Sequence, residues 1–401
     1  MANMHASLSP ASGTGPRRAV FHIGMPKTGS STIQSWLYGN VAALARQGFH
    51  LERLPVLRAR AQEHVEIAIC QFAEAGELFP NARLRHLFGI ETRADQADFA
   101  ARYSERFARA MARARGQTVL LSAEDIGGLT RTEAQARALD TWLGRCFDEV
   151  RYILYLRRQE DQLVSAYSQM VKTGRTERLD AFIGANKSRD YNAMVGAWHG
   201  AVGEARLSVR LLEPDALTGG DLIADFANAA GIDRAGLRPA THKNSALTRA
   251  AAEFLRALNA ELRANGSKDP VNEPVYGNLV PFLQTAFADD APIRLDARQT
   301  DEIRTANAAS NEALRQRCFP ERAALFPARP GAIAEVPPLD PADVARVGAI
   351  VLQAKQEGRL RAREDLRKPP SLAQRVWRWT KERHPALAAR IGPIIGKEVQ
   401  P

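Results

Sequence analysis

A lysine within a turn rich in glycine and hydroxyl side chains is the residue of this sequence best suited to chemistry. Lys27 lies between Gly24 and Gly29, in a segment, His22–Gln34, that reads HIGMPKTGSSTIQ. An apolar run precedes the turn and helical spacing follows it, so a strand, a loop and a helix are expected in that order. Backbone N–H groups converge in such a turn, and the helix N-terminus adds partial positive charge. The pattern predicts a cradle for a phosphate-like anion; a chance glycine turn before a helix is the alternative.

The two glycines are spaced as in a Walker A loop, but the lysine stands elsewhere. Gly24 and Gly29 have four residues between them, and Ser30 occupies the position where G-x-x-x-x-G-K-[ST] has its Lys. A P-loop kinase uses that Lys on the β- and γ-phosphates and the next hydroxyl on Mg²⁺. The lysine of this loop is instead followed by a group of hydroxyl side chains: Thr28, Ser30, Ser31 and Thr32. This layout suits one compact anion without an obligatory metal.

A second candidate anion site follows another apolar run, which is expected to be a strand over 150–156. Arg157 comes directly after that run, and Ser165 comes eight residues later within an expected helix. The guanidinium can bind a phosphate through a charge-assisted fork, and the serine can add its hydroxyl. Both residue types are common at such positions, so the pair is meaningful only in combination with the Lys27 loop.

Two residues are candidates for a general base. Glu124 lies two residues beyond an expected strand over 118–122, at the sheet edge where a substrate would bind. The alternative for Glu124 is an acid that stabilises a helix N-terminus. His64, in a helix expected over 59–75, titrates near neutral pH without any tuning, and a packed structural histidine is its alternative.

With both anion sites considered, the chain resembles the PAPS-dependent sulfotransferases, especially the bacterial branch that is similar to the carbohydrate sulfotransferases. In that family a PKxGT/S-type loop holds the 5′-phosphosulfate of 3′-phosphoadenosine 5′-phosphosulfate (PAPS), and Pro26–Thr32 matches it. An Arg, seven residues and a Ser hold the 3′-phosphate, and Arg157 and Ser165 match that spacing. The resemblance covers about residues 18–327. The late GxxGxxK motif of the cytosolic branch is not found.

The resemblance implies transfer of a sulfuryl group from PAPS to a hydroxyl or amine of an acceptor, in line and without a metal, with 3′,5′-ADP as the leaving group. It implies that Lys27 stabilises the charge that develops on the bridging oxygen. A carbohydrate or glycolipid is the acceptor that it favours. A P-loop nucleotide kinase and a non-catalytic anion-binding or scaffold protein are the alternatives. The sequence suggests no cluster of metal ligands.

Buried strands alternate with helices along much of the chain, which predicts an α/β fold with a P-loop-like, doubly wound parallel sheet flanked by helices. The expected strands lie at 19–23, 49–54, 118–122, 150–156 and 207–212. Beyond residue 240 only helices are expected, at 247–264, 300–318 and 343–363. The predicted organisation is a disordered lead-in at 1–17, a sulfotransferase domain at 18–327, a linker at 328–341 and a basic helical C-terminal extension at 342–401.

The bulk composition favours a globular protein of a reducing, cytoplasmic setting. Of 401 residues, 45% are apolar and 25% charged, and the three cysteines are too few and too scattered for a disulfide framework. No apolar run is long enough for a transmembrane helix. Residues 351–401 carry 12 Lys and Arg against 5 Asp and Glu, which accounts for most of the net charge of +10. The rest of the chain is too weakly basic to predict a nucleic-acid partner.

The basic C-terminal tail leaves two interpretations open. Residues 375–381 read RVWRWTK, and residues 391–395 are mostly apolar. Such a segment would rest on an anionic membrane surface and hold the enzyme at its inner face. Alternatively, it forms a terminal helix that packs on its own domain or on the second subunit of a homodimer.

Overall fold

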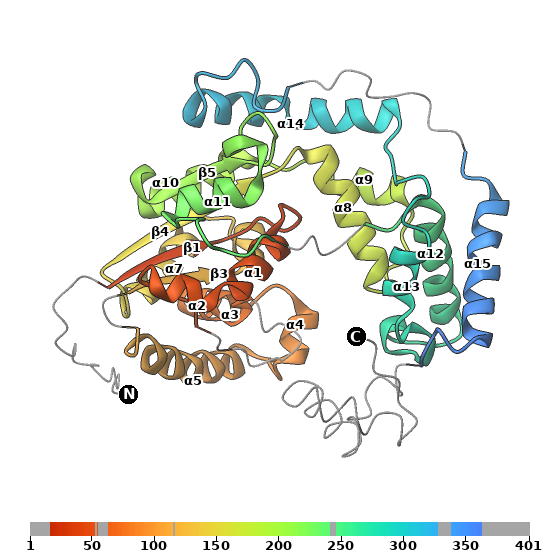
Figure 1. Cartoon of the computed structure of the whole chain (residues 1–401), viewed down its shortest axis with the longest axis horizontal. Coiled ribbons are helices and arrows are strands. Elements are labelled where there is room, and N and C mark those ends of the chain that lie inside the picture. The colour runs from red at the N-terminus through yellow and green to blue at the C-terminus, as the bar shows by residue number, and fades with distance from the viewer. Residues whose placement is uncertain are drawn as a thin grey trace. The chain divides into compact units, whose positions relative to one another are not determined.

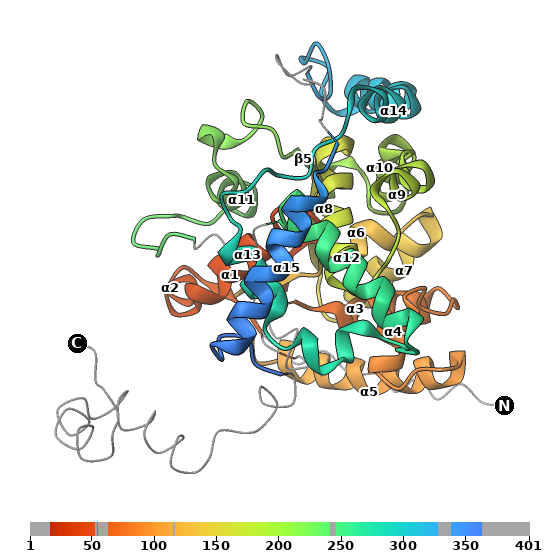
Figure 2. The same cartoon turned by 90° about the vertical axis from the view of Figure 1, so that its right-hand side faces the viewer.

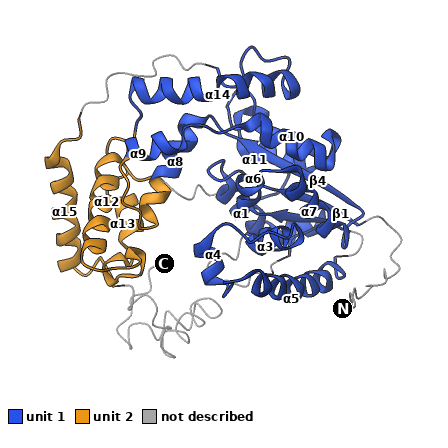
Figure 3. Cartoon of the chain, turned by 180° about the vertical axis from the view of Figure 1, so that it is seen from behind, with its two compact units in different colours: residues 1–167, 179–245, 294–336 blue, residues 168–178, 246–293, 337–401 orange. Residues whose placement is uncertain are grey.

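The computed structural model describes residues 17–52, 54, 63–114, 117–240, 246–327 and 338–362. They divide into two compact units, each assembled from segments that are separated in the sequence (Figure 3). The first unit draws on 1–167, 179–245 and 294–336, and the second on 168–178, 246–293 and 337–401. The first unit contains the sheet and all the predicted site residues. The domain boundaries expected from the sequence stay predictions, and the tail beyond 362 lies outside the described residues.

The first unit is built on a five-stranded sheet in which every neighbouring pair of strands is parallel. Its strands are β1 (Arg18–His22), β2 (Phe49–His50), β3 (Thr118–Ser122), β4 (Glu149–Leu156) and β5 (Leu207–Leu211). They are arranged in the order β2-β3-β1-β4-β5 (Figure 1). The sheet and its helices confirm the predicted α/β fold. Because consecutive strands are added on opposite sides of β1, the carboxyl end of β1 is a topological switch point, where ligands bind in open α/β sheets.

Helices cover both faces of the sheet, because alternate residues of each central strand are apolar on both sides. Val20, Leu120 and Ile153 pack with one group of helices: α1 (Ser30–Gly39), α2 (Val41–Arg46) and α11 (Leu222–Ala230). Phe21, Leu121 and Leu154 pack with the other group: α3 (Val65–Glu74), α5 (Arg93–Met111), α7 (Glu133–Gly144) and α10 (Tyr191–Val202). Both faces of the sheet are therefore buried.

The other helices of the first unit surround the carboxyl ends of the strands or brace the segments there. They are α4 (Ala82–Leu87), α6 (Glu124–Leu129), α9 (Leu179–Asn186) and α14 (Ala297–Cys318), together with the first part of α8 (Gln159–Lys172). The sequence patterns did not predict α4, α6 or α9, which are all short, and α6 contains two glycines. No helix of the described residues is long and apolar enough to cross a membrane.

The second unit is helical. It contains α12 (Arg249–Ala264), α13 (Leu279–Ala286), which was not predicted, and α15 (Pro341–Gln356). These helices lie side by side in Figure 2. A β-bridge joins Thr248 to Pro292, and Arg346 forms an ion pair with Asp290. The helix expected at 343–363 is present as α15, but it begins at Pro341 and ends at Gln356, seven residues earlier than expected.

A buried carboxylate fastens α11 to the sheet. Asp225 is inaccessible to solvent. It accepts hydrogen bonds from Tyr155 Oη at 2.6 Å, from Arg210 Nε at 3.0 Å and from the Thr218 N–H at 3.1 Å. Burial alone would raise the pKa of Asp225, but the bonds from Arg210, Tyr155 and Thr218 outweigh it and hold the pKa below its ordinary value of 3.8.

Replacing Asp225 with Ala is expected to reduce the free energy of unfolding by about 3 kcal/mol, because Arg210 and Tyr155 lose their shared acceptor. Since the folded-state pKa is depressed, this contribution is present above the unfolded-state pKa and is lost as the pH falls through the folded-state value. Urea unfolding at neutral and acidic pH measures both effects. Asp215→Ala is the control, because it removes an exposed carboxylate paired with Arg322 and should change little. Unchanged stability of Asp225→Ala at neutral pH would contradict the assignment.

Candidate active site at the carboxyl edge of the sheet

Three of the predicted site residues follow three adjacent strands. Lys27 lies in the loop after β1, Glu124 comes after β3, and Arg157 comes directly after β4. Because β3 and β4 flank β1 in a parallel sheet, these residues emerge at the same edge. The charges of Glu124 and Arg157 both act on the ammonium of Lys27. The structure thus brings the predicted lysine, acid and arginine into one site.

The loop after β1 depends on backbone conformations that side chains disfavour. Gly24 and Gly29 have positive φ angles of 100° and 87°, and Lys27 itself has a φ of 68°. A left-handed conformation at a residue with a side chain costs about 1–2 kcal/mol, and it persists only where its surroundings enforce it. The contacts that enforce it at Lys27 come from within the loop and from the segments after β4.

Within the loop, two hydroxyl groups turn inward. Thr28 Oγ1 donates to the carbonyl oxygen of Met25 at 2.6 Å, and Ser30 Oγ donates to the same oxygen at 3.1 Å. Both side chains are buried. Their hydroxyls therefore brace the loop from within. The hydroxyl-bearing Ser31 and Thr32 are only half-buried.

The segments after β4 hold the next two carbonyl groups of the loop. Gln162 Nε2 donates to the carbonyl oxygen of Pro26 at 3.2 Å, and Arg157 Nη1 donates to that of Lys27 at 3.0 Å. The hydroxyl of Tyr191 lies 2.8 Å from both the Arg157 carbonyl oxygen and Gln162 Oε1. The two candidate anion sites are thus parts of one hydrogen-bonded assembly.

The helix that follows the loop presents its N-terminus without a competing acid. Gly29 is the N-cap residue of α1, and neither a side-chain cap nor an acidic residue occupies the first turn of this helix. The Gly29 carbonyl accepts from the N–H groups of Thr32 and Ile33, so those of Ser30 and Ser31 have no place in the helical ladder. Together with the positive end of the helix dipole, they suit an anion.

The Lys27 side chain is partly buried, and charges of both signs act on its ammonium. Burial is the main effect and lowers the pKa of its ammonium below the ordinary value of 10.5. Glu124, Asp125 and Glu63 raise that pKa, whereas the nearby Arg157 lowers it. Partial burial weakens the hydration of this ammonium, which strengthens its interaction with a nearby negative charge.

Glu124 is the first residue of α6, and the backbone of this helix lies directly against the loop. The N–H of Gly127 donates to the carbonyl oxygen of Ile23 at 2.6 Å. A Cβ added to Gly24 would collide with the carbonyl oxygen of Glu124. Both interpretations made from the sequence, a general base and a helix-terminal acid, are compatible with this position.

His64 is placed differently from the expectation. It lies just before α3 rather than inside a helix, and it is buried. Its Nδ1 is 3.1 Å from the Ser122 carbonyl oxygen, and its Nε2 is 3.1 Å from the carbonyl oxygen of Glu52. Burial lowers the pKa of the imidazole. This geometry favours a role in joining β3 to the segment after β2 over a role in proton transfer.

Ser165 lies on α8, three residues beyond Gln162, and is half-buried. Residues three apart share a helix face, so Ser165 belongs to the face of α8 that reaches the loop through Gln162. Sequence reasoning missed Gln162 and Tyr191 as parts of the site. The sequence held a signal for Gln162, which lies between Arg157 and Ser165. Tyr191 is the first residue of α10.

One further pair of candidates lies in a segment that the structure does not describe. Asn244 and Ser245 precede the helix expected at 247–264, where they could form its N-cap or contact a substrate, and they lie within the segment 241–245. Within the part of the chain that is described, no group of three or more His, Cys, Asp or Glu side chains is placed to hold a metal ion.

Comparisons with known proteins give limited similarity. No family model matches the chain. An uncharacterized protein of Archaeoglobus fulgidus is 32% identical over 113 residues, which are 28% of this chain and 31% of that relative's length. The crystal structure of a sulfotransferase from Alicyclobacillus acidocaldarius aligns with a TM-score of 0.37 and 12% identity, over 76% of this chain and 96% of the other. Similarity of this degree assigns neither family nor activity, which must be argued from the residues.

Replacing Gly24 with Ala should distort the site, because the new Cβ meets the Glu124 carbonyl oxygen and the φ of 100° disfavours a side chain. We expect a loss of thermal stability together with a loss of anion binding, measured as the shift in melting temperature caused by inorganic sulfate. Gly39→Ala is the matched control: a Cβ there meets nothing within 4 Å, and we expect no loss of stability. Equal behaviour of the two variants would contradict the close approach of α6 to the loop.

Proposed function

We propose that this chain transfers a sulfuryl group from PAPS to a hydroxyl or amine of an acceptor. The observation that supports this most is the link between the two anion sites, in which Arg157 Nη1 donates to the carbonyl oxygen of Lys27 at 3.0 Å. A donor with a phosphosulfate at one end and a phosphate at the other requires two such sites at a fixed separation. Lys27 belongs to one of them, and Arg157 with Ser165 belongs to the other.

In the proposed complex, each end of the donor has its own partners. The 5′-phosphosulfate lies over Pro26–Thr32 and accepts hydrogen bonds from loop N–H groups and from the first turn of α1. The 3′-phosphate is bound by Arg157 and Ser165. Arg157 donates to the loop through Nη1, and the proposal is that further N–H donors of the same guanidinium bind the phosphate.

The proposed reaction is a single in-line displacement. The acceptor oxygen or nitrogen forms a bond to sulfur while the bond from sulfur to the bridging phosphate oxygen breaks. The electron pair of the broken bond stays on that oxygen, which leaves as part of 3′,5′-ADP. The acceptor proton passes to Glu124, and the ammonium of Lys27 stabilises the charge on the leaving oxygen. The proposal assigns this stabilisation to Lys27 and not to a metal.

The acceptor and the cellular location of the enzyme are also proposals, and they rest only on the resemblance and on the composition. We propose a carbohydrate or glycolipid acceptor and a cytoplasmic enzyme. The segment beyond 362 keeps its two interpretations: contact of the basic tail with the inner face of a membrane, or a terminal helix that packs on its own domain or on the second subunit of a homodimer. A nucleic-acid partner is not part of the proposal.

The donor site is tested by the thermal shift that 3′,5′-ADP produces. We expect a clear rise in melting temperature for the unaltered protein, none for Lys27→Ala and a reduced one for Arg157→Ala, because each change removes a cation from one end of the ligand. Lys268→Ala, at an exposed position, is the control and should respond like the unaltered protein.

Two outcomes would overturn this proposal. A larger stabilisation by ATP with Mg²⁺ than by 3′,5′-ADP would favour the kinase alternative, and no shift with either nucleotide would favour a non-catalytic protein. Glu124→Gln separates binding from chemistry. It should bind 3′,5′-ADP normally but lose transfer of label from radioactive PAPS to acceptors in a cell-envelope extract.

The lowered pKa of Lys27 predicts how donor binding depends on pH. Binding of an anion favours the protonated lysine, so the affinity for 3′,5′-ADP should begin to fall at a pH below the ordinary lysine value of 10.5. Calorimetric titration at increasing pH measures the fall. Lys27→Arg is the matched control, because a guanidinium stays protonated over this range. The same alkaline decline in both proteins would rule out Lys27 as its cause.

A further inference from the structure

A buried hydroxyl group lies between the two candidate anion sites. It belongs to Tyr191, the first residue of α10, which is only 1% exposed. The Tyr191 Oη lies 2.8 Å from the carbonyl oxygen of Arg157 and 2.8 Å from Gln162 Oε1. Burial raises the pKa of this phenol, so the hydroxyl keeps its one proton at neutral pH and shares it between the two oxygens.

Through Gln162, the hydroxyl of Tyr191 acts on the peptide group that precedes Lys27. Gln162 is 2% exposed, and its Nε2 donates to the carbonyl oxygen of Pro26 at 3.2 Å. While Oε1 accepts from Tyr191, the NH2 end of the amide is directed at Pro26. Without the hydroxyl, Oε1 would be buried without this donor, and the amide would gain by turning toward another one. The bond from Tyr191 therefore keeps Gln162 in the orientation that holds the loop.

Through Arg157, the same hydroxyl acts on the peptide group that follows Lys27. Tyr191 donates to the backbone carbonyl of Arg157, and the guanidinium of Arg157 donates to the Lys27 carbonyl oxygen at 3.0 Å. The two routes end on the carbonyl groups on either side of the Lys27 Cα. The left-handed conformation of this lysine, with a φ of 68°, persists only where its surroundings enforce it. One hydroxyl thus supports both contacts that reach the loop from the segments after β4.

The ring of Tyr191 is held by packing that does not involve its hydroxyl. The rings of Tyr191 and Phe326 meet edge to face, with centroids 6.4 Å apart and an interplanar angle of 67°. The guanidinium of Arg158 lies 5.8 Å from the centroid of the Phe326 ring, and its Nη2 pairs with Glu213 at 3.1 Å. A phenylalanine in place of Tyr191 would therefore keep the ring packing and lose only the hydroxyl.

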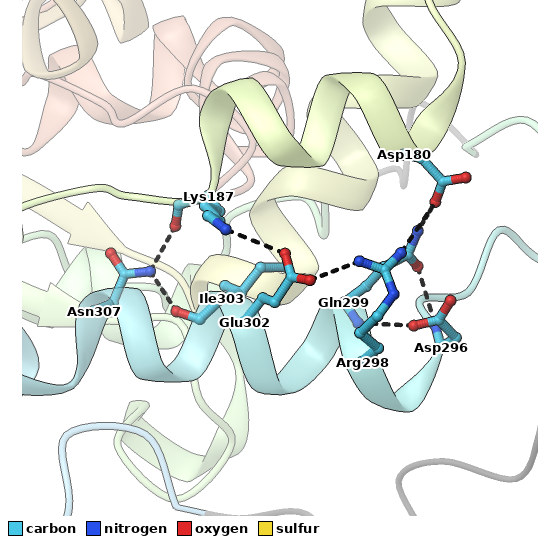
Figure 4. A network of polar contacts seen from close by, with 8 residues as sticks. All are labelled: Asp180, Lys187, Asp296, Arg298, Gln299, Glu302, Ile303 and Asn307. Carbon is cyan, nitrogen blue, oxygen red and sulfur yellow. Dashed lines mark hydrogen bonds and ion pairs between the residues drawn. The ribbon is translucent and has the colours of Figure 1, made fainter.

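The backbone before Tyr191 is fixed by α14. Asn307 of this helix is 1% exposed, and its Nδ2 donates to the carbonyl oxygens of Lys187 and Ile303, each at 2.7 Å (Figure 4). Its Oδ1 accepts from the N–H of Arg189 at 2.7 Å. The short segment that leads into α10 is thus anchored just before Tyr191, so the hydroxyl is presented from a fixed position.

We propose that Tyr191 is a positioning residue of the donor site, an inference that rests on the proposed function. Its hydroxyl, acting through Gln162 and Arg157, holds the peptide groups on either side of Lys27 in the orientation that binds the ligand. Tyr191 acts through these two residues and not on the reacting groups. Because Arg157 also belongs to the second anion site, the same hydroxyl couples the two ends of the donor site.

The test compares the unaltered protein with Tyr191→Phe in their affinity for 3′,5′-ADP, measured by calorimetry on the full chain. We expect a loss of about fivefold, because a hydrogen bond that supports the loop is removed. The affinity should also begin to fall at a higher pH in the variant, nearer the ordinary lysine value of 10.5, since a loosened loop leaves the Lys27 ammonium less buried. A tyrosine that only stabilises the fold would not change this pH profile.

Two further variants separate positioning from stability. Tyr152→Phe is the matched control: Tyr152 is buried, and its hydroxyl donates to Asp140 of α7 at 2.8 Å, so its loss should lower the melting temperature but not the affinity. Gln162→Met has a side chain of similar length without the amide and should reproduce the loss of affinity. It carries the test should Tyr191→Phe fail to fold, as judged by circular dichroism. In the double variant the two losses should combine to less than their product, because both changes break the same contact.

Three results would overturn the inference and leave the proposed function standing. They are an affinity of Tyr191→Phe equal to that of the unaltered protein, an alkaline decline at the same pH in both, and losses that multiply in full in the double variant. Failure of 3′,5′-ADP to bind the unaltered protein would instead remove the proposed function. The rise in melting temperature caused by inorganic sulfate then tests the tyrosine, and it should be smaller in Tyr191→Phe. Binding of neither ligand would overturn both.

Discussion

The site depends on the capture of three consecutive carbonyl groups in the loop after β1. The carbonyl oxygens of Met25, Pro26 and Lys27 each accept a hydrogen bond from a side chain of the protein. A peptide group is planar and trans in most of the chain, so an oxygen fixed on one side directs the following N–H to the other. Holding the Pro26 and Lys27 oxygens therefore fixes the orientation of the two peptide groups that flank Lys27. Lys27 adopts its left-handed conformation between these two held groups.

The sheet makes this constraint possible by its order of strands. With β1 between β3 and β4, the loop can be held from β4 by Arg157 and can face the acid that follows β3. Ser122, the last residue of β3, fixes the opposite side, since its hydroxyl lies 2.9 Å from His22 Nδ1 and 3.1 Å from Gln34 Nε2. Helix α1 is thereby joined to β3, the strand that precedes Glu124. The relative positions of Lys27, Glu124 and Arg157 are therefore set by three neighbouring strands, β1, β3 and β4.

Much of this architecture could be predicted from the sequence, because its signals are local. The strand at 118–122 was predicted with its observed bounds, and Lys27 lies as expected in a loop between a strand and a helix. The adjacency of Arg157 to that loop depends on the order of the strands, which local signals do not give. The sequence could not show the direction of side chains. The Thr28 and Ser30 hydroxyls turn into the loop. Both ring nitrogens of His64 lie within hydrogen-bond distance of backbone carbonyl oxygens. Those directions depend on partners that are distant in the chain.

The direct backbone contact between α6 and the loop has a consequence for how such a protein can change over time. The helix that carries Glu124 is held by the Gly127 N–H on the Ile23 carbonyl oxygen, with no side chain between the two segments. The separation of Glu124 from Lys27 is therefore set by main-chain contacts and by two glycines, Gly24 and Gly127. Apolar residues of the interior can be exchanged over many generations without moving the reacting groups. Substitutions should therefore be tolerated less at Gly24 and Gly127 than at the apolar positions of the interior.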